Sequence, residues 1–285
     1  MNERRGKQMN LFDQLQALQN IPHAFSEWED YREVLTRYII EQAYGKQEVA
    51  VLGCGRCNDI DIKLLSMYFE KVYLIDKDRI GMEAALKQYG LWEHPRIEMR
   101  ISQFTGIDDN DIRDYADLLI QEVRRRGMLT NVDELANATL KALDALEEKM
   151  REYEGTLGQY DNTVIVGVHS QLINMLHWIW HVILQTIGKE EDKVRQRIMM
   201  LNELCTSKFN EAVIKATKAH IIVGCEESKV DIPGTIQGAL QGMADIKKRI
   251  QKGQLKKVND ERMLWPFNKE EAKVYQMKIQ TLKVL

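Results

Sequence analysis

The most informative stretch of this 285-residue sequence is VLGCGRCND, residues 51–59. It continues the short apolar run Val49–Leu52, and such a run that ends at a turn signal is typical of a strand buried on both faces. Gly53 and Gly55 follow at once, and glycine lets the backbone turn sharply and approach a ligand closely. A helical pattern comes next, and a helix N-terminus offers free backbone N–H groups to a ligand. The stretch therefore predicts a strand–turn–helix unit that binds a ligand.

Two further residues narrow the class of ligand. A phosphate-binding P-loop is excluded at this site, because no Gly-Lys-Ser/Thr follows the turn. In the dinucleotide fingerprint G-x-G-x-x-G, the third glycine allows helix and strand to pack closely. Asn58 occupies that position here, which argues against a nicotinamide dinucleotide. Asp76 ends the next apolar run, where a carboxylate can accept hydrogen bonds from ribose hydroxyls. The glycine turn and Asp76 together predict a ligand that contains adenosine.

The rest of the sequence alternates between short apolar runs and helical patterns. The runs predict strands at 49–52, 72–75, 97–101, 164–166, 220–223, 263–265 and 274–284. The helical patterns cover 61–69, 79–89, 110–125, 131–152, 171–187, 190–216 and 235–252. This alternation predicts an α/β fold with a Rossmann-like, mostly parallel sheet of about seven strands and helices on both faces. The last two runs have only a short link, so the final strand is expected to be antiparallel.

One sheet-centred domain accounts for most of the chain. Residues 1–46 predict an N-terminal helical cap, and residues 47–285 predict one domain with helical insertions near 108–160 and 226–261. In an open α/β sheet, ligands bind beyond the carboxyl ends of the strands, where insertions often form lids or dimer surfaces. The insertion helix at 131–152 carries an apolar stripe. We expect this helix and the N-terminal helices to face the acceptor or to join two copies, which leaves a homodimer open.

The composition predicts a cytoplasmic protein without a membrane segment. Lys and Arg number 40 against 43 Asp and Glu, and the net charge of −3 argues against nucleic acid or an anionic membrane as partner. The N-terminus shows no apolar signal core, and the apolar stretch Leu172–Leu184 is shorter than the roughly 20 residues of a membrane span. Cys54 and Cys57 form a CxxC, but no second pair completes a zinc site, so no metal is predicted.

With these motifs, the sequence resembles the class I, Rossmann-like S-adenosylmethionine-dependent methyltransferases. The resemblance covers residues 46–285 and rests on Leu52-Gly53-Cys54-Gly55, on Ile75-Asp76 and on the closing strand at 274–284. GCGRCNDID, LIDKD and HSQL resemble a bacterial subgroup of methyltransferase-like proteins. The family implies S-adenosylmethionine as cofactor and an unidentified methyl acceptor. A small molecule is favoured as acceptor, because the Asn/Asp-Pro-Pro-aromatic and Pro-Cys motifs of base methylation are missing from the sequence.

The resemblance implies cofactor contacts after the first two strands. Gly53, Cys54 and Gly55 would lie against the methionine part of the cofactor, and Asn58, Asp59 or Asp61 would contact its amino group. Beyond the second strand, the family position that holds the ribose corresponds to Asp76, and the residue bordering the adenine corresponds to Lys77. Gln103, after the third strand, matches the acid that commonly accepts a hydrogen bond from the adenine amine.

The fourth strand leads into the turn that faces the transferred methyl in this family. His169, Ser170 and Gln171 occupy that turn and are expected to contact the cofactor. His169 is the candidate general base, because its ordinary pKa suits the removal of a proton from an acceptor near neutral pH. Two plainer interpretations stay open. His169 could be a hydrogen-bonded histidine at a strand end, and Ser170 and Gln171 could cap the next helix.

Two departures from the family pattern keep alternative functions open. Val51 stands where the family usually has an acid, and Cys57 replaces the third glycine of its motif. A second hypothesis is therefore a non-catalytic module that binds S-adenosylmethionine or S-adenosylhomocysteine on the same scaffold. A third hypothesis, a nicotinamide-dependent oxidoreductase, is disfavoured by Asn58 and by the predicted antiparallel closing strand.

Overall fold

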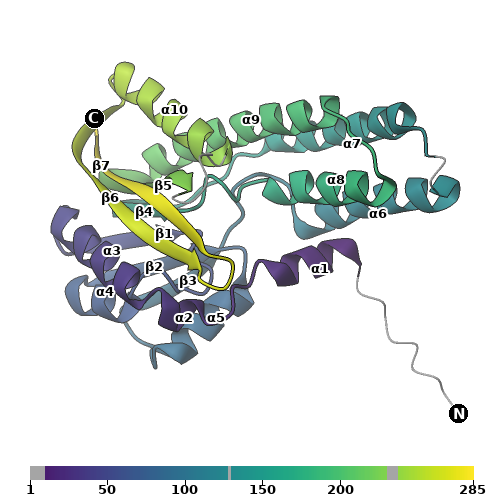
Figure 1. Cartoon of the computed structure of the whole chain (residues 1–285). Helices are drawn as coiled ribbons and strands as arrows, with labels where there is room; N and C mark the ends of the chain where they lie inside the picture. Colours follow the sequence, from purple (N-terminus) through teal and green to yellow (C-terminus); the bar gives the residue numbers. More distant parts are fainter. Residues whose placement is uncertain (1–9, 128–129, 230–236) are drawn as a thin grey trace, which may run out of the picture. The chain divides into compact units, whose positions relative to one another are not determined.

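The apolar runs form one seven-stranded sheet in the computed structural model, which describes residues 10–127, 130–229 and 237–285 (Figure 1). The strands are β1 (Glu48–Leu52), β2 (Lys71–Asp76), β3 (Ile97–Ile101), β4 (Tyr160–Val166), β5 (Thr217–Lys229), β6 (Leu255–Asn268) and β7 (Lys273–Val284). Their order is β3-β2-β1-β4-β5-β7-β6. β1 to β5 pair in parallel, whereas β7 is antiparallel to both of its neighbours, β5 and β6. The predicted mostly parallel sheet with an antiparallel last strand is therefore confirmed.

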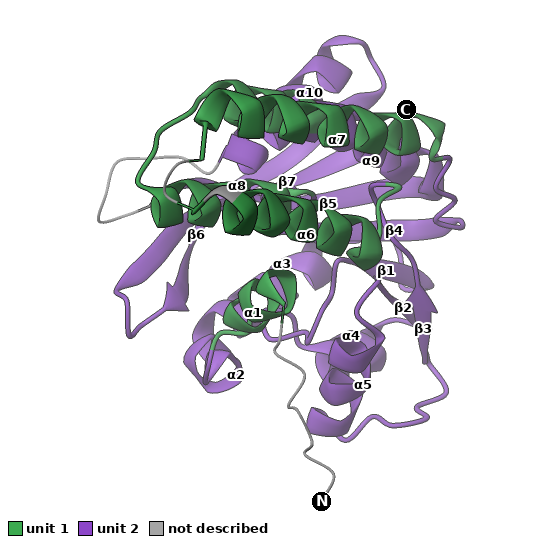
Figure 2. Cartoon of the chain, turned by 90° about the vertical axis from the view of Figure 1, so that its right-hand side faces the viewer, with its two compact units in different colours: residues 1–21, 106–153, 173–201 green, residues 22–105, 154–172, 202–285 purple. Residues whose placement is uncertain are grey.

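The chain divides into two compact units (Figure 2). The helical unit consists of residues 1–21, 106–153 and 173–201, and the sheet unit of residues 22–105, 154–172 and 202–285. The helices of the chain are α1 (Leu11–Leu18), α2 (Ala24–Glu27), α3 (Glu29–Gln42), α4 (Ile62–Tyr68), α5 (Arg79–Gln88), α6 (Asp109–Arg126), α7 (Val132–Glu152), α8 (Asn174–Ile187), α9 (Lys193–Ala216) and α10 (Gln237–Gln251). The predicted insertion at 108–160 supplies α6 and α7, and the predicted cap at 1–46 contributes to both units. The predicted division into a cap at 1–46 and a domain at 47–285 stays a prediction.

The core of the sheet unit forms because side chains alternate between the two faces of each strand. On one face, Leu52, Ile165 and Val223 are buried side by side with Phe209 of α9 and Ile246 of α10. Figure 1 shows α3, α4 and α5 on the other face. There the Tyr38 hydroxyl of α3 lies 3.0 Å from Thr281 Oγ1 of β7. Both faces of the central strands are thus covered, as their continuous apolar runs predict.

The helical unit packs α1, α6, α7, α8 and the beginning of α9. Apolar side chains of α7 and α8 are buried, including Leu143 and Trp180. Arg197 of α9 binds Asp144 of α7 at 2.6 Å, and it also contacts Glu147. No helix in the described ranges is both long and apolar enough to cross a lipid bilayer.

The strands at the carboxyl end of the chain are longer than predicted. β5 continues to Lys229 and β6 begins at Leu255, so the segment predicted as an insertion at 226–261 is divided among β5, α10 and β6, with residues 230–236 outside the described ones. β6 is an edge strand, and its first half is exposed and polar, as at Lys256 and Lys257. Charged side chains on an edge strand discourage pairing with other chains, and they also remove the apolar pattern by which a strand is recognised.

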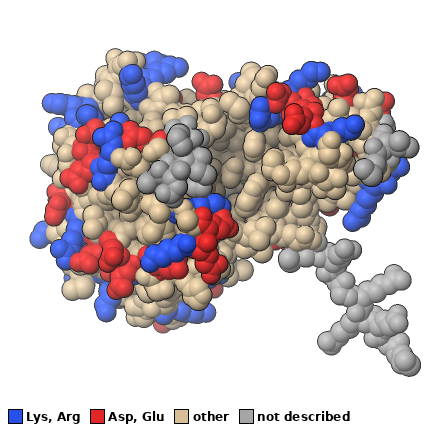
Figure 3. Space-filling view, in the orientation of Figure 1, with Lys and Arg blue, Asp and Glu red and all other residues tan. Residues whose placement is uncertain are grey.

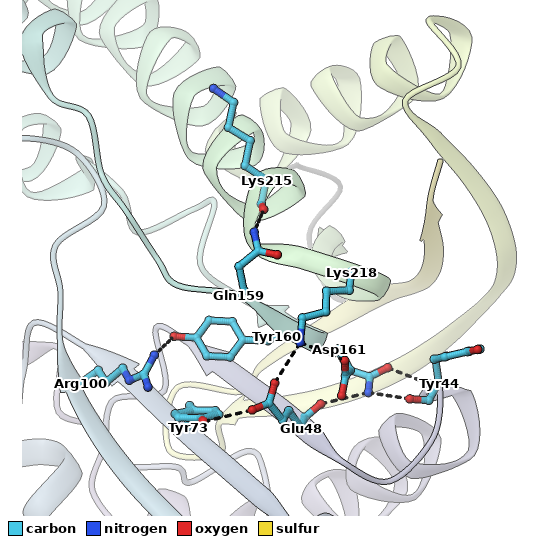
Figure 4. A network of polar contacts seen from close by, with 10 residues as sticks. Tyr44, Glu48, Tyr73, Arg100, Gln159, Tyr160, Asp161, Lys215 and Lys218 are labelled. Carbon is cyan, nitrogen blue, oxygen red and sulfur yellow. Dashed lines mark hydrogen bonds and ion pairs between the residues drawn. The ribbon is translucent and has the colours of Figure 1, made fainter.

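A polar network joins the amino ends of β1, β4 and β5 to Tyr73 of β2 and to Arg100 near the end of β3 (Figure 4). Its members, which we call the amino-edge network, are Tyr44, Glu48, Tyr73, Arg100, Tyr160, Asp161, Asn162 and Lys218. Asn162 is fully buried, and its side chain makes three hydrogen bonds, to the backbone N–H and carbonyl of Tyr44 and to the carbonyl of Glu48. Arg100 donates to the Tyr160 hydroxyl at 2.6 Å. Each of these polar groups has a partner, so the network holds β1, β4 and the residues before β1 in register.

Candidate functional site

The glycine turn after β1 has the geometry that its sequence predicts. Gly53 and Gly55 have φ angles of +67° and +46°, which L side chains rarely adopt. A Cβ on Gly53 would lie 2.7 Å from Val168 Cγ2, whereas a Cβ on Gly55 would meet open space within 4 Å. Gly53 thus allows the turn to pack against the loop after β4, and the Gly55 backbone faces an open side on which a ligand can lie.

Asp76 holds this turn from the end of β2. Its Oδ2 accepts a hydrogen bond from the Gly55 N–H at 2.8 Å, and its Oδ1 accepts one from the Asp78 N–H at 2.9 Å. An ionised carboxylate has about four acceptor positions, so two further hydrogen bonds are open to hydroxyl groups of a ligand. Lys77, the next residue, is exposed. The structure therefore brings Asp76 and Gly55 together, as the spacing of the two motifs predicts.

Apolar surface lies beside Asp76. Ile101 of β3 pairs with Asp76 in the sheet register, and its side chain is 58% exposed. Ile80, at the start of α5, is 75% exposed, and the half-buried Gln103 follows β3. Exposed isoleucines beside a carboxylate are suited to cover one face of an aromatic base. No sequence pattern marks either isoleucine, because their exposure depends on where the strand ends and where the helix starts.

The chain between Gly55 and α4 is held by backbone contacts. Cys57 has a φ of +50°, and its N–H donates to the Cys54 carbonyl at 2.7 Å. The guanidinium of Arg32 donates to the Asn58 carbonyl at 2.9 Å. Both thiols are buried, and burial together with the neighbouring Cys57 thiol raises the pKa of Cys54 well above its usual value. Cys54 is therefore a neutral thiol that contributes to the turn through its backbone.

Asp59 carries a carboxyl group within the same loop. It is half-buried, and burial raises its pKa to about 6, although the charge of Arg32 acts in the opposite direction. Asp61, two residues on, caps α4 by accepting from the Leu64 N–H at 2.9 Å. Of these two acids, Asp59 is the one whose carboxyl group is not used to cap a helix.

The predicted base, His169, is enclosed by protein. Its side chain is fully buried, with Nε2 2.8 Å from Asn210 Oδ1 and Nδ1 3.5 Å from Cys225 Sγ. A Cβ on Gly242 of α10 would lie 2.5 Å from the His169 ring, so the glycine makes room for it. Burial lowers the pKa of His169. These are the surroundings of the plainer interpretation, a hydrogen-bonded histidine at a strand end.

Ser170, in contrast, contacts a second acid, Glu226, which no sequence motif marks. Its hydroxyl donates to Glu226 Oε1 at 2.6 Å, and Glu226, in the last part of β5, is only 2% exposed. Glu226 Oε2 has no hydrogen-bond partner among the described residues. Burial raises the pKa of Glu226, and the hydrogen bond from Ser170 lowers it in part. Gln171 is exposed and donates to Ser170 Oγ at 3.4 Å.

Two further buried polar atoms have no hydrogen-bond partner within the described part of the chain, the Tyr31 hydroxyl and Trp265 Nε1. The Tyr31 and Trp265 rings stack with centroids 5.7 Å apart. Asp59 and Glu226 both raise the pKa of Tyr31, after the larger effect of burial. We call Tyr31, Glu226 and Trp265 the aromatic–carboxyl cluster. In the sequence, Tyr31 belongs to an apolar helix face and Trp265 to a predicted strand, so no local pattern marks either residue as part of a site.

Comparison with known proteins gives similarity in structure only. No protein-family model and no curated protein matches the sequence. Magnesium protoporphyrin IX methyltransferase (ChlM) from Synechocystis PCC 6803, solved with bound SAH, is 10% identical, with a TM-score of 0.47 over 98% of this chain and 89% of that one. A SAM dependent methyltransferase from Aquifex aeolicus is 10% identical, with a TM-score of 0.46 over 96% and 98% of the two chains. The N-methyltransferase NodS from Bradyrhizobium japonicum WM9, in complex with SAH, is 8% identical, with a TM-score of 0.40 over 97% and 89%.

The strand order identifies the fold independently of these similarities. Five parallel strands are followed by β6 and β7, and β7 inserts antiparallel between β5 and β6. The glycine turn and Asp76 lie at the carboxyl ends of β1 and β2. The chain therefore has the fold of the class I, Rossmann-like S-adenosylmethionine-dependent methyltransferases.

Proposed function

We propose that the protein is an S-adenosylmethionine-dependent methyltransferase that acts on a small molecule. The observation that carries this proposal is the glycine turn, whose open Gly55 backbone is fixed to Asp76 by a 2.8 Å hydrogen bond. A ligand at this turn can place hydroxyl groups on the remaining acceptor positions of Asp76 and lie against backbone without meeting side chains. The cofactor supplies a methyl group on a positively charged sulfur. The residues of the turn fit its uncharged adenosine part and its methionine part.

The cofactor contacts of the proposal are distributed over the loops that follow β1 to β4. Residues 53–55 would bind the methionine part, with Asn58 or Asp59 near its amino group. Asp76 would accept from the ribose hydroxyls, and Lys77 and Gln103 would border the adenine ring. A positively charged sulfur beside the half-buried Asp59 and the buried Glu226 would also be favoured by their charges.

His169 enters this proposal as a positioning residue. Its ring is enclosed and both of its nitrogens lie next to polar atoms of the protein. Through Asn210, it is linked to Asp245 of α10 at 2.9 Å and so to the buried Arg249. This chain of contacts fixes the turn that carries Ser170, and Ser170 in turn orients Glu226.

The distribution of charge and the state of the cysteines support a small-molecule acceptor and a cytoplasmic location. Figure 3 shows basic and acidic side chains interspersed on the face in view. A protein that binds the phosphate backbone of a nucleic acid presents a continuous basic surface to it. The four cysteines are free thiols, and free thiols are typical of proteins in reducing compartments.

Calorimetric titration with S-adenosylmethionine and S-adenosylhomocysteine tests the proposal. We expect both to bind the wild-type protein, and we expect Asp76→Asn to weaken binding by about tenfold or more, since hydrogen bonds to a charged group contribute about 1.5–3 kcal/mol each. Asp30→Asn, an exposed position on α3, is the matched control and should leave the affinity unchanged. Wild-type protein that binds neither compound would overturn the proposal.

One observation favours a second candidate, a module that binds the cofactor without methyl transfer. The only histidine in the turn after β4 is enclosed and does not reach a ligand as a base. A binding module would retain S-adenosylmethionine unchanged in the presence of a metabolite extract, whereas an enzyme would convert it to S-adenosylhomocysteine. Mass spectrometry of the nucleoside product distinguishes the two.

A further inference from the structure

We propose that the aromatic–carboxyl cluster binds the basic nitrogen of an amine, so that the methyl acceptor is a small cationic amine. This inference rests on the proposed function and adds the class of acceptor to it. It starts from three buried polar atoms, the Tyr31 hydroxyl, Glu226 Oε2 and Trp265 Nε1, which lack hydrogen-bond partners among the described residues. A buried polar group without a partner costs about 1–3 kcal/mol. Such groups are rare in native proteins and call for a specific explanation. An ammonium carries only donors, so it can pair with Glu226 Oε2 and with the Tyr31 hydroxyl oxygen, whereas Trp265 Nε1–H is itself a donor and needs an acceptor from another part of the ligand.

The charge of the cluster points to a cation. The hydrogen bond from Ser170 is the one side-chain contact of the Glu226 carboxyl in the described ranges, and no Lys or Arg side chain there forms an ion pair with it. The half-buried Asp245 shows the usual arrangement in this chain, because it pairs with the buried Arg249 at 2.6 Å. A buried carboxylate is stable only when it is paired. A protonated amine would supply the positive charge that Glu226 lacks.

The aromatic rings around the cluster favour the same ligand. Trp265 contacts Trp28 at 4.9 Å, Phe267 at 4.9 Å and Tyr275 at 6.2 Å between ring centroids, in addition to the stacked Tyr31. The faces of aromatic rings attract cations, and the attraction is largest where water is excluded. A neutral alcohol or amide could also pair with the polar atoms, but it would lack the attraction between a cation and the ring faces.

The register of the sheet places the cluster at the edge that carries the glycine turn. Leu52 of β1, Ile165 of β4 and Val223 of β5 are neighbours across the sheet. Gly53 follows the first of them directly, and Glu226 lies three residues beyond the last. An amine held by Glu226 is therefore at the carboxyl edge of the strands, the edge at which ligands of open α/β sheets bind.

Glu226 would also move the proton that the amine must lose before its nitrogen can attack. The N–H bond of the ammonium breaks as an O–H bond forms at Glu226 Oε2, so an ammonium and a carboxylate become a neutral amine and a carboxylic acid. The raised pKa of this buried carboxyl group brings it closer to that of an amine and favours the transfer. Charge and atoms balance without a further reactant.

The experiment compares amines with alcohols of the same shape. Ligand-observed NMR titrations use ethylamine and benzylamine against ethanol and benzyl alcohol, with and without saturating S-adenosylhomocysteine. We expect at least one amine to bind about tenfold or more tightly than its alcohol. We expect Glu226→Gln to remove this preference, since a glutamine keeps the acceptor for Ser170 but not the charge. Tyr31→Phe should weaken amine binding, whereas Tyr115→Phe, which removes another buried hydroxyl without a described partner, on α6, should not.

Each outcome decides one of the two proposals. Equal binding of amines and alcohols by the wild-type protein, or no binding of any of the four, overturns the amine inference. So does a preference for amines that survives in Glu226→Gln. Binding of S-adenosylhomocysteine to both proteins, measured by calorimetry in parallel, shows that the variant is folded. If the wild-type protein binds neither S-adenosylhomocysteine nor S-adenosylmethionine, the proposed function fails, while the amine preference is still measured.

Discussion

The sheet unit contains two groups of polar side chains at opposite ends of β4 and β5, and they differ in how completely they are hydrogen-bonded. In the amino-edge network, the buried Asn162 makes three hydrogen bonds and the Tyr160 hydroxyl accepts from Arg100. In the aromatic–carboxyl cluster, three buried polar atoms have no partner within the described residues. Both groups lie mainly on strands and helices, with Tyr44 in the segment before β1 as the exception.

The difference separates polar groups that stabilise the fold from polar groups available to a ligand. A complete network gives its full stabilisation to the folded protein, and removal of one member leaves another without a partner. An incomplete cluster lowers stability and gains its missing hydrogen bonds only when a ligand arrives. Substitutions at the two ends of the sheet should therefore change the free energy of unfolding by different amounts and in opposite directions.

Asn162→Ala should have the largest effect on stability. It removes the partners of the Tyr44 N–H, the Tyr44 carbonyl and the Glu48 carbonyl in a fully buried position. We expect a loss of about 2–4 kcal/mol in the free energy of unfolding, measured by urea denaturation. Asn110→Ala, at an exposed position of α6, is the control and should change stability by less than about 0.5 kcal/mol. A loss of similar size in both variants would contradict the prediction that the amino-edge network stabilises the fold more than an exposed polar residue does.

Asp59→Asn should act in the opposite direction. The pKa of Asp59 is about 6 in the folded protein, above the ordinary value of an unfolded chain near 3.9. The folded state therefore binds the proton more tightly, and the contribution of Asp59 to stability falls as the pH rises from about 4 to 6. At pH 7 the asparagine variant should be more stable than wild type by about 1–2 kcal/mol, and below pH 4 the two should be equal. Thermal unfolding at several pH values measures this, and a variant less stable than wild type at pH 7 would contradict it.

The smallest effect is expected in a matched pair of tyrosines. Tyr160→Phe removes the acceptor of Arg100 Nη1 and should cost about 1–1.5 kcal/mol. Tyr31→Phe removes a hydroxyl that has no described partner, so the change should be below about 0.5 kcal/mol or in favour of the variant. Urea denaturation of the two variants under the same conditions makes the comparison. Equal losses would show that the Tyr31 hydroxyl has a structural partner after all.

The sequence predicts those parts of the molecule that depend on neighbours along the chain. The alternation of strands and helices, the reversed last strand and the turn at Gly53 all follow from local patterns, and the structure confirms them. The hydrogen bond between Gly55 and Asp76 connects two motifs whose spacing is characteristic of the fold. The polar first half of β6 was not predicted, because an exposed edge strand lacks the apolar pattern that marks a strand.

The aromatic–carboxyl cluster could not be predicted, for a different reason. Tyr31, Glu226 and Trp265 come from a helix before the sheet, from the end of β5 and from β6. Their side chains meet only through tertiary packing, and no spacing in the sequence relates them. The enclosure of His169 has the same origin, because it depends on Gly242 of α10. The sequence shows that a residue is polar, but it does not show whether that residue has a hydrogen-bond partner in the folded protein.

The insertion of β7 between β5 and β6 has a consequence for the order of folding. Among the described strands, β6 pairs only with β7, across a link of residues 269–272, so the two can close as a local hairpin. That hairpin joins the parallel strands only when β7 docks on β5, a contact between distant residues such as His220 and Lys283, and contacts of this kind form slowly. Trp265 reaches Tyr31 only at that step. An intermediate with β1 to β5 formed would therefore have the glycine turn but not the complete aromatic–carboxyl cluster, so the proposed cofactor site would form before the proposed acceptor site.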